Sequence, residues 1–145
     1  FYSHMWTDVT SKENGGLGQP ATGSGNTPTY NDILVKYNAA NGYKRYWDDA
    51  AKAPYLFNGS TFISYDDPQS LYEKAKYVLD KKLGGAMFWE YSNDSTGTLL
   101  NALADGLKGN SYEPEIQALE APDASNEPQT NEDLETPEAV EVPVQ

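Results

Sequence analysis

Trp89 and Glu90 stand side by side in the run GGAMFWEYSND, residues 84–94, and they raise the first chemical question. The indole of Trp89 offers a flat apolar face. The C–H bonds on the faces of a sugar ring pack well against such a surface, while polar groups at the rim can fix the ring hydroxyls. A tryptophan at the end of a strand can also simply belong to the core, and the residue types alone leave both interpretations open.

Few other residues could do chemistry. His4 is the only histidine, and a lone histidine is more often a binding or packing residue than a catalytic base. Asp48-Asp49 and Asp66-Asp67 are sequence neighbours, so on a strand their side chains point to opposite faces and cannot flank one bond. Such pairs near turns are mostly caps or solvated ends, and Asp67 is expected to cap a helix.

The composition argues against several kinds of site. The chain has no cysteine and one histidine, which excludes a disulfide framework and a thiolate metal site and argues against a zinc cluster. The Gly-rich segment 15–25 has neither a GxGxxG pattern nor a P-loop lysine. The net charge of −12 would repel phosphates, and no apolar run approaches the roughly 20 residues of a membrane helix. We therefore expect no metal, no cofactor, no nucleic-acid partner and no membrane-spanning segment.

Charge divides the chain into two parts. Residues 1–109 contain 10 basic and 12 acidic residues, whereas residues 110–145 contain 10 acidic residues and no basic one. Of the 18 aromatic residues, 17 precede residue 110. This division predicts a folded part, residues 1–109, followed by an acidic disordered linker or tail, residues 110–145.

Three segments have the apolar periodicity of helices. Residues at helical spacing predict a first helix that begins at Tyr30 and closes on Gly42, and two further helices over 68–82 and 99–107. Asp67 precedes a proline and is the expected N-cap of the second helix, and Asp94 or a neighbouring hydroxyl is the expected cap of the third.

Short runs rich in aromatic and β-branched residues predict strands. An aromatic strand is expected to end within residues 1–6, followed by an exposed loop over 10–28, and an apolar parallel strand is expected at 86–91. Between them, Asn58-Gly59 predicts a type I′ hairpin turn. Three antiparallel strands are expected at 43–47, 53–57 and 61–65.

This order of elements predicts an α/β fold. It is strand, helix, strand, helix, with a small α+β insertion after the first strand, and βα order favours a parallel sheet or barrel. In a parallel β/α barrel the active site lies at the C-terminal ends of the strands, which here are FYSHMW and FWEY. Side chains alternate along a strand, so Met87, Trp89 and Tyr91 would share one face and Phe88 and Glu90 the other.

With these segments in place, the chain closely resembles the C-terminal part of glycoside hydrolase family 18, the chitinases. FYSHMW is similar to the FYGRGW-like end of that family's seventh barrel strand. NGYKRYWDDAAKAPYLFNGSTFISYDD resembles its α+β insertion, and PQSLYEKAKYVLDKKLGGAMFWEYSNDSTGTLLNAL resembles its seventh helix, eighth strand and eighth helix. The resemblance implies the C-terminal part of a (β/α)8 TIM barrel at residues 1–109, with an insertion over roughly residues 7–66.

The resemblance also implies sugar-binding roles for single residues. Trp89 matches the tryptophan that floors the −1 sugar subsite, and Glu90 follows it at a variable position. Tyr2 matches the cleft tyrosine of the YGR run. His4 stands where that run has arginine, which removes a charged bidentate donor.

The insertion is implied to contribute two further residues to the cleft. Tyr30 and Asn31 match an aromatic-plus-glutamate pair that lines the cleft in the family. Asn31 replaces the carboxylate and keeps only its hydrogen-bonding capacity.

The catalytic signature of the family is absent from these 145 residues. Neither the Asp-x-x-Asp-x-Asp-x-Glu run nor the Met-x-Tyr-Asp run occurs. In this family the glutamate of the first run is the general acid and the substrate's own N-acetyl group is the nucleophile. We therefore expect no catalytic residue here, only residues that bind substrate.

The resulting hypothesis is the C-terminal portion of a secreted chitinase that hydrolyses β-1,4 bonds in chitin with retention, with further modules in the same polypeptide. One alternative is a non-catalytic chitinase-like carbohydrate-binding protein, because His4 and Asn31 both depart from the family pattern. Another is a family 18 endo-N-acetylglucosaminidase or cell-wall glycosidase. An intact or altered DxxDxDxE run upstream would separate enzyme from lectin.

Overall fold

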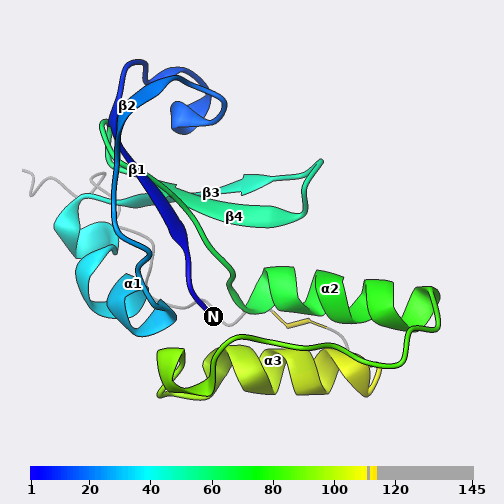
Figure 1. Ribbon diagram of the computed structural model, residues 1–145. Helices are drawn as coiled ribbons and strands as arrows, with labels where there is room; N and C mark the ends of the chain where they lie inside the picture. The colour runs from blue at the N-terminus through cyan, green and yellow to red at the C-terminus, as the bar shows by residue number, and fades with distance from the viewer. Residues whose placement is uncertain (111, 114–145) are drawn as a thin grey trace, which may run out of the picture.

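The structure is a computed structural model that describes residues 1–110 and 112–113. It consists of a five-stranded sheet, a short helix α1 (Tyr30–Lys36) on the sheet, and a pair of longer helices, α2 (Pro68–Asp80) and α3 (Thr98–Leu107) (Figure 1). No helix in this described part is long and apolar enough to cross a membrane. The predicted disordered tail lies outside the described residues, apart from positions 110, 112 and 113.

The sheet is entirely antiparallel and has the order β2-β1-β5-β4-β3. Its strands are β1 (His4–Val9), β2 (Ala21–Ser24), β3 (Lys44–Asp48), β4 (Ala53–Phe57) and β5 (Phe62–Ser64). The three predicted antiparallel strands are thus confirmed as β3, β4 and β5. The prediction of one exposed loop over residues 10–28 is wrong, because this segment contains β2.

The first predicted strand is present, but the strands that pair with it are not the expected ones. We expected a parallel barrel strand ending within residues 1–6, but β1 starts at His4 and pairs antiparallel with β2 and β5. His4 pairs with Ser64 and Trp6 pairs with Phe62. Sheet hydrogen bonds depend on which strands lie nearby, and the described residues place two insertion strands beside β1.

The turn between β4 and β5 lies where the sequence predicts it but is not of type I′. Gly59 has φ +99°, whereas Asn58 is not among the residues with positive φ, and a type I′ turn needs both. Instead, Oδ1 of Asn58 accepts hydrogen bonds from the backbone N–H groups of Ser60 (3.0 Å) and Thr61 (2.7 Å). The turn is therefore closed by the Asn58 side chain, and only Gly59 takes the left-handed backbone conformation.

Helix α1 is held at its start by a capping box. The Thr29 hydroxyl accepts from the Asp32 N–H at 3.2 Å, and the Asp32 carboxylate accepts from the Thr29 N–H at 3.1 Å. The helix ends at Lys36, earlier than predicted, and Gly42 instead follows a short 3-10 turn, Ala39–Asn41. Ile33 anchors α1 in the core.

Helices α2 and α3 have the predicted caps. Asp67 accepts from the Ser70 N–H at 2.9 Å to start α2. The carboxylate of Asp94 accepts from three N–H groups in the first turn of α3, those of Thr98 (3.1 Å), Leu99 (2.8 Å) and Leu100 (3.1 Å). Such caps satisfy backbone donors that have no partner within the helix.

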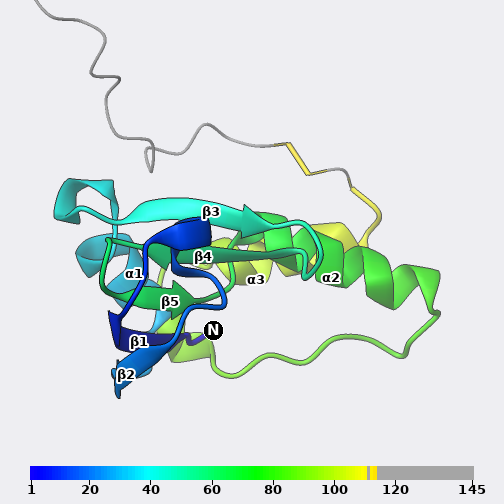
Figure 2. The same ribbon diagram turned by 90° about the horizontal axis from the view of Figure 1, so that it is seen from above.

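The two helices lie side by side and bury their apolar faces in one cluster with the sheet and α1 (Figure 2). Gly106 of α3 sits at the closest approach, where an added Cβ would lie 2.6 Å from Cβ of Ala75. A larger residue could not be accommodated there without moving a helix.

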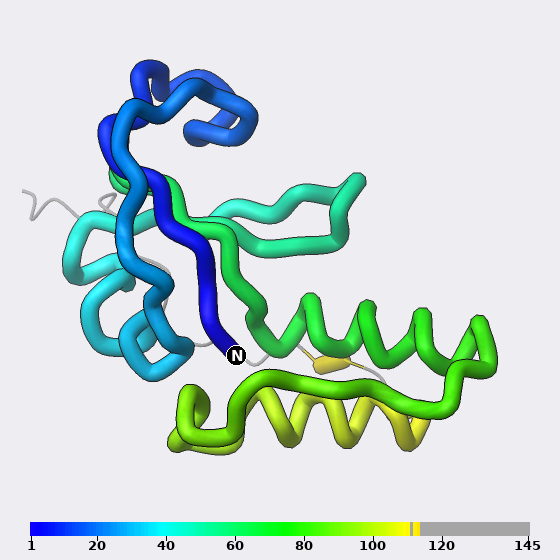
Figure 3. The backbone as a smooth tube through the Cα atoms, in the orientation of Figure 1, coloured from blue at the N-terminus to red at the C-terminus, as the bar shows by residue number. Residues whose placement is uncertain are grey.

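Residues 86–91 do not form the predicted strand. They belong to an irregular connection that runs back from the end of α2 to the start of β1 and continues to α3 (Figure 3). The short 3-10 turn η3 (Tyr91–Asn93) follows. A parallel strand needs a ladder of backbone partners. The amine of Phe1 donates to the carbonyl of Trp89 and the Phe1 ring stacks on Phe88 at 4.7 Å, but no strand pairs with residues 86–91 in the described part of the chain.

Candidate functional site

Trp89 lies at the surface of the described structure. Its side chain is 66% exposed, while the preceding Phe88 stacks on Phe1 against the core. Phe88 therefore points inward and Trp89 outward, as the alternation inferred from the sequence predicts, although the segment is not a regular strand. The peptide bond between Trp89 and Glu90 is cis. An exposed indole face is available for a flat apolar ligand.

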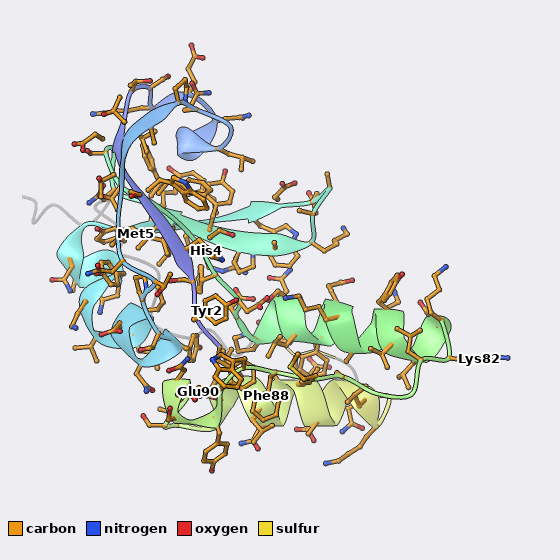
Figure 4. The ribbon with its side chains drawn as sticks, in the orientation of Figure 1. Tyr2, His4, Met5, Lys82, Phe88 and Glu90 are labelled. Carbon is orange, nitrogen blue, oxygen red and sulfur yellow. The ribbon has the colours of Figure 1, made fainter. Side chains whose placement is uncertain are left out.

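A row of aromatic rings lies along β1 and the residue pair before it. Tyr2, His4 and Trp6 alternate with inward residues, so their side chains share one face of the strand, and we call them the β1 row. The Tyr2 and His4 rings meet edge to face at 5.6 Å, and the His4 and Trp6 rings lie 6.1 Å apart. Tyr2 is 47% exposed and Trp6 41%. Figure 4 shows Tyr2 and His4 in sequence along β1, with Phe88 and Glu90 beside its beginning.

Trp6 was not selected from the sequence, although the signal was present. Its position two residues beyond His4 places it on the same strand face. Its ring also meets that of Phe62 at 5.9 Å. The face with Trp6 is the one turned away from α1, because Met5 between the row residues packs against the core.

Tyr30 does not reach this surface. It is only 5% exposed and belongs to the core cluster with Ile33 and Leu99. Burial raises the pKa of its phenol above the ordinary value, which keeps the group neutral. Tyr30 also lines a small pocket together with Tyr2 and Ser3, and its part in a sugar cleft stays a prediction.

Asn31 faces the loop after Trp89. Its Nδ2 donates to the carbonyl of Ser92 at 3.0 Å. Its Oδ1 accepts from both the N–H and the hydroxyl of Ser95, each at 2.8 Å. The amide is thereby bonded through both of its heavy atoms to a segment more than 60 positions away in sequence.

Glu90 is half-buried and is bonded to the same loop. Its Oε1 accepts a hydrogen bond from the hydroxyl of Ser92. Trp89, Glu90 and Asn31 are thus brought together through the loop 91–95, while Tyr2 and His4 approach from β1. Of the six residues predicted for the site, only Tyr30 lies in the interior.

The model for glycosyl hydrolases family 18 matches residues 1–94. The chain belongs to glycoside hydrolase family 18.

Individual family 18 relatives agree with this assignment. Chitinase A1 of Niallia circulans is 43% identical over 116 residues, which cover 74% of this chain and 16% of that protein. The structure of a family 18 N-acetylglucosaminidase from Paenibacillus barengoltzii is 51% identical with a TM-score of 0.69, covering 73% of this chain and 31% of that one. A chitinase-like agglutinin from Robinia pseudoacacia is 28% identical with a TM-score of 0.63, covering 73% and 30%.

The chain therefore spans less than a third of the length of these family 18 relatives. Membership of the family and the structural matches imply a TIM-barrel-type fold. The described residues form a small α/β part with a five-stranded sheet, not a full barrel.

The two Asp-Asp pairs of this family 18 chain have structural partners. Asp66 accepts from Lys74 at 2.6 Å, and Asp67 accepts from Arg45 at 2.6 Å while capping α2. Asp48 accepts from the backbone N–H of Ala50 in a turn. Over residues 1–110 and 112–113, no three His, Asp or Glu side chains gather in a way that could hold a metal ion. The site offers aromatic faces and hydrogen bonds.

Proposed function

We propose that this chain is part of a family 18 chitinase and binds chitin or N-acetylglucosamine oligosaccharides along Trp89 and the β1 row. The observation that carries the proposal is the exposed indole of Trp89, whose backbone carbonyl accepts from the amine of Phe1, together with the exposed Tyr2, His4 and Trp6 that follow Phe1, in a chain of this family. Sugar rings of a β-1,4-linked polymer present C–H-rich faces to such rings. Chitin binding is the role of this surface.

The reaction of the complete enzyme is hydrolysis of β-1,4 bonds with retention. In the substrate-assisted scheme of the family, the N-acetyl group of the substrate attacks and one glutamic acid protonates the leaving oxygen. No DxxDxDxE run occurs in these 145 residues. The role of this segment is to hold the sugar, and no proton-transfer step is assigned to it.

Each surface residue has a distinct part in this proposal. Trp89 is the floor on which one sugar ring stacks. Tyr2 contributes an aromatic edge and a hydroxyl, and His4 contributes ring nitrogens in place of the guanidinium of the family pattern. Glu90 and Asn31 stand beside the floor, where their polar groups can take part in sugar binding or shape the loop that carries it.

The cellular setting follows from the substrate. Chitin is an extracellular polymer, so we place the protein outside the cell as a secreted enzyme. The relatives are several times longer than this chain, and we expect further modules of the same polypeptide to act with it.

A second candidate function is non-catalytic carbohydrate binding. It is favoured by the similarity to a chitinase-like agglutinin and by His4 at the position of the family arginine. A third is hydrolysis by a family 18 N-acetylglucosaminidase, which is favoured by the 51% identity to an enzyme of that name. Both keep Trp89 as the sugar floor and differ in what the rest of the protein does.

The test uses the complete gene product that contains these residues. Turnover of a chromogenic N-acetylglucosamine oligomer and oligomer affinity are measured for the wild type, Trp89→Ala and the control Trp47→Ala, which removes an indole from β3. Loss of one stacking face should weaken binding by about 2 kcal/mol, or about 30-fold, and the control should bind normally. Wild-type binding without turnover would favour the agglutinin-like function. Equal oligomer affinity in the wild type and Trp89→Ala, or no binding by the wild type, would reject the proposal.

A further inference from the structure

Asn31 joins two segments, one of which directly follows the proposed sugar floor. One is α1, which is fixed in the core by Ile33 at 1% exposure. The other is the loop 91–95, which connects Trp89 and Glu90 to α3. We call the three hydrogen bonds from Asn31 to Ser92 and Ser95 the Asn31 bridge.

The chemistry of the bridge requires an amide. Nδ2 must donate to a carbonyl oxygen, at Ser92, while Oδ1 must accept from an N–H and a hydroxyl, both of Ser95. A carboxylate of the same shape can accept from Ser95 but cannot donate to Ser92, and would face the carbonyl oxygen with a negative charge. An aliphatic side chain can do neither.

The bridge continues toward Trp89 through Ser92. The backbone carbonyl of Ser92 accepts from Asn31, and its hydroxyl donates to Glu90, the residue directly after Trp89. On the other side of the loop, Asp94 is fixed by its bonds to the first turn of α3. The segment between Ser92 and Asp94 is short, so its conformation depends on the bond that Asn31 makes at Ser92.

We propose that Asn31 is a positioning residue that sets the orientation of Trp89 and Glu90 through Ser92. The inference rests on the proposed function only in naming sugar binding as the consequence. It assigns Asn31 a task other than direct sugar contact, because both heavy atoms of its amide are already bonded within the protein. A ligand could bond to Asn31 only by sharing or replacing these contacts.

The experiment compares Asn31→Asp and Asn31→Leu with the wild type in the complete gene product, across pH 4 to 8. At neutral pH, Asn31→Asp should bind N-acetylglucosamine oligomers about tenfold more weakly, since the Nδ2 donor bond to Ser92 is lost and a negative charge faces the Ser92 carbonyl oxygen. As the pH falls and its carboxyl protonates, the regained O–H donor should restore affinity toward the wild-type value measured at the same pH. Asn31→Leu should be weak throughout, without recovery.

Two controls separate this effect from a general change in charge or folding. Asn101→Asp introduces the same charge on an exposed part of α3 and should bind like the wild type at each pH. Thermal melting identifies any variant that is unfolded. If Asn31→Leu fails to fold, the pH-dependent recovery of Asn31→Asp still decides the question, because a merely destabilising substitution has no reason to recover at low pH.

A readout without sugar keeps the inference independent of the proposed function. In protein labelled with 5-fluorotryptophan, the fluorine resonance of Trp89 is assigned by its loss in Trp89→Phe. In Asn31→Asp this resonance should shift at neutral pH and return to the wild-type position at low pH. A resonance that matches the wild type at every pH would overturn the inference, whether or not the protein binds sugar. A pH-dependent shift without sugar binding would support the bridge and reject the function.

Discussion

Arg45 on β3 donates two hydrogen bonds to Oδ2 of Asp67, at 2.9 and 2.6 Å, and thereby ties the sheet to the start of α2. The same Asp67 uses Oδ1 to cap α2 at Ser70. The side chain of Asp67 is 9% exposed and that of Arg45 is 28% exposed. One buried carboxylate therefore serves both the helix cap and the contact between the two parts of the fold.

Replacing Arg45 by methionine should destabilise the protein substantially. The methionine keeps much of the aliphatic packing but leaves the Asp67 charge buried without its partner, which costs about 3 kcal/mol in comparable cases. The expected result is a lower melting temperature for Arg45→Met, measured by thermal unfolding of the complete gene product.

The double variant Arg45→Met/Asp67→Asn is the control for this interpretation. Asparagine retains an oxygen that can cap α2 and carries no charge, so part of the lost stability should return. If the double variant is less stable than Arg45→Met, the unpaired charge is not the cause.

The helix caps and the hairpin position could be predicted because their determinants are local. Asp67 followed by Pro68 indicates a helix start whatever surrounds it, and Asp94 lies four residues before the first residue of α3. The turn at Asn58-Gly59 was likewise placed correctly. Only its type was wrong. A type I′ turn needs positive φ at Asn58, whereas here the Asn58 side chain closes the turn by accepting hydrogen bonds.

The sheet could not be predicted in full because strand pairing depends on distant residues. The segment Ala21–Ser24 consists of small and polar residues typical of a loop, and it is a strand because β1 lies beside it. Residues 86–91 show the opposite case. Their apolar run is typical of a parallel strand, yet within the described residues they lack neighbours with which to pair.

The site shows the same division between local and distant determinants. Strand alternation was enough to indicate that Trp89 and Phe88 point in opposite directions. It could not reveal that Asn31 would be hydrogen-bonded to Ser92 and Ser95, because the residues near position 31 do not indicate which distant segment of the chain lies beside them. Nor could it show that Tyr30 would be almost fully buried, since the direction of a side chain on a short helix depends on how the helix is docked.

Gly106→Val should destabilise the α2–α3 contact. The first added atom would lie 2.6 Å from Cβ of Ala75 and 3.3 Å from Cδ1 of Tyr72, so the helices must separate. Overpacking of this kind costs about 1–3 kcal/mol. Thermal unfolding should show the loss.

Gly84→Ala is the matched control for Gly106→Val. A Cβ at Gly84 meets no atom within 4 Å, and Gly84 is not among the glycines with positive φ. This variant should melt close to the wild type. Equal losses in the two variants would show that the helix contact is not the cause.

Asp32→Asn should reduce stability at neutral pH but not at strongly acidic pH. The Lys36 ammonium and the Thr29 hydroxyl and N–H donate to the Asp32 carboxylate, which lowers its pKa to about 2. A folded-state pKa below the unfolded value of about 3.9 means that the carboxylate stabilises the fold above about pH 4 and loses this effect as the pH falls through about 2.

The measurement is the difference in melting temperature between Asp32→Asn and the wild type at pH 7 and pH 2.5. At pH 7 the variant should lose about 0.5–1 kcal/mol, the usual size of a helix-start interaction, and the difference should shrink at pH 2.5. Asp105→Asn removes an exposed carboxylate paired with Lys108 and should show little effect at either pH. A difference for Asp32→Asn that does not change with pH would contradict the assigned pKa effect.

His4→Arg should strengthen sugar binding if the β1 row contacts the ligand as proposed. Arginine would place a permanent charge and a planar set of donors between Tyr2 and Trp6, whose rings already lie 5.6 and 6.1 Å from that of His4. A charge-assisted hydrogen bond to a sugar hydroxyl at this exposed position should add about 1.4 kcal/mol, or about tenfold in affinity. Calorimetric titration with N-acetylglucosamine oligomers measures it. His4→Lys carries the charge without the planar fork and should gain less, so an equal gain would assign the effect to charge alone, and no gain in either variant would place the ligand away from β1.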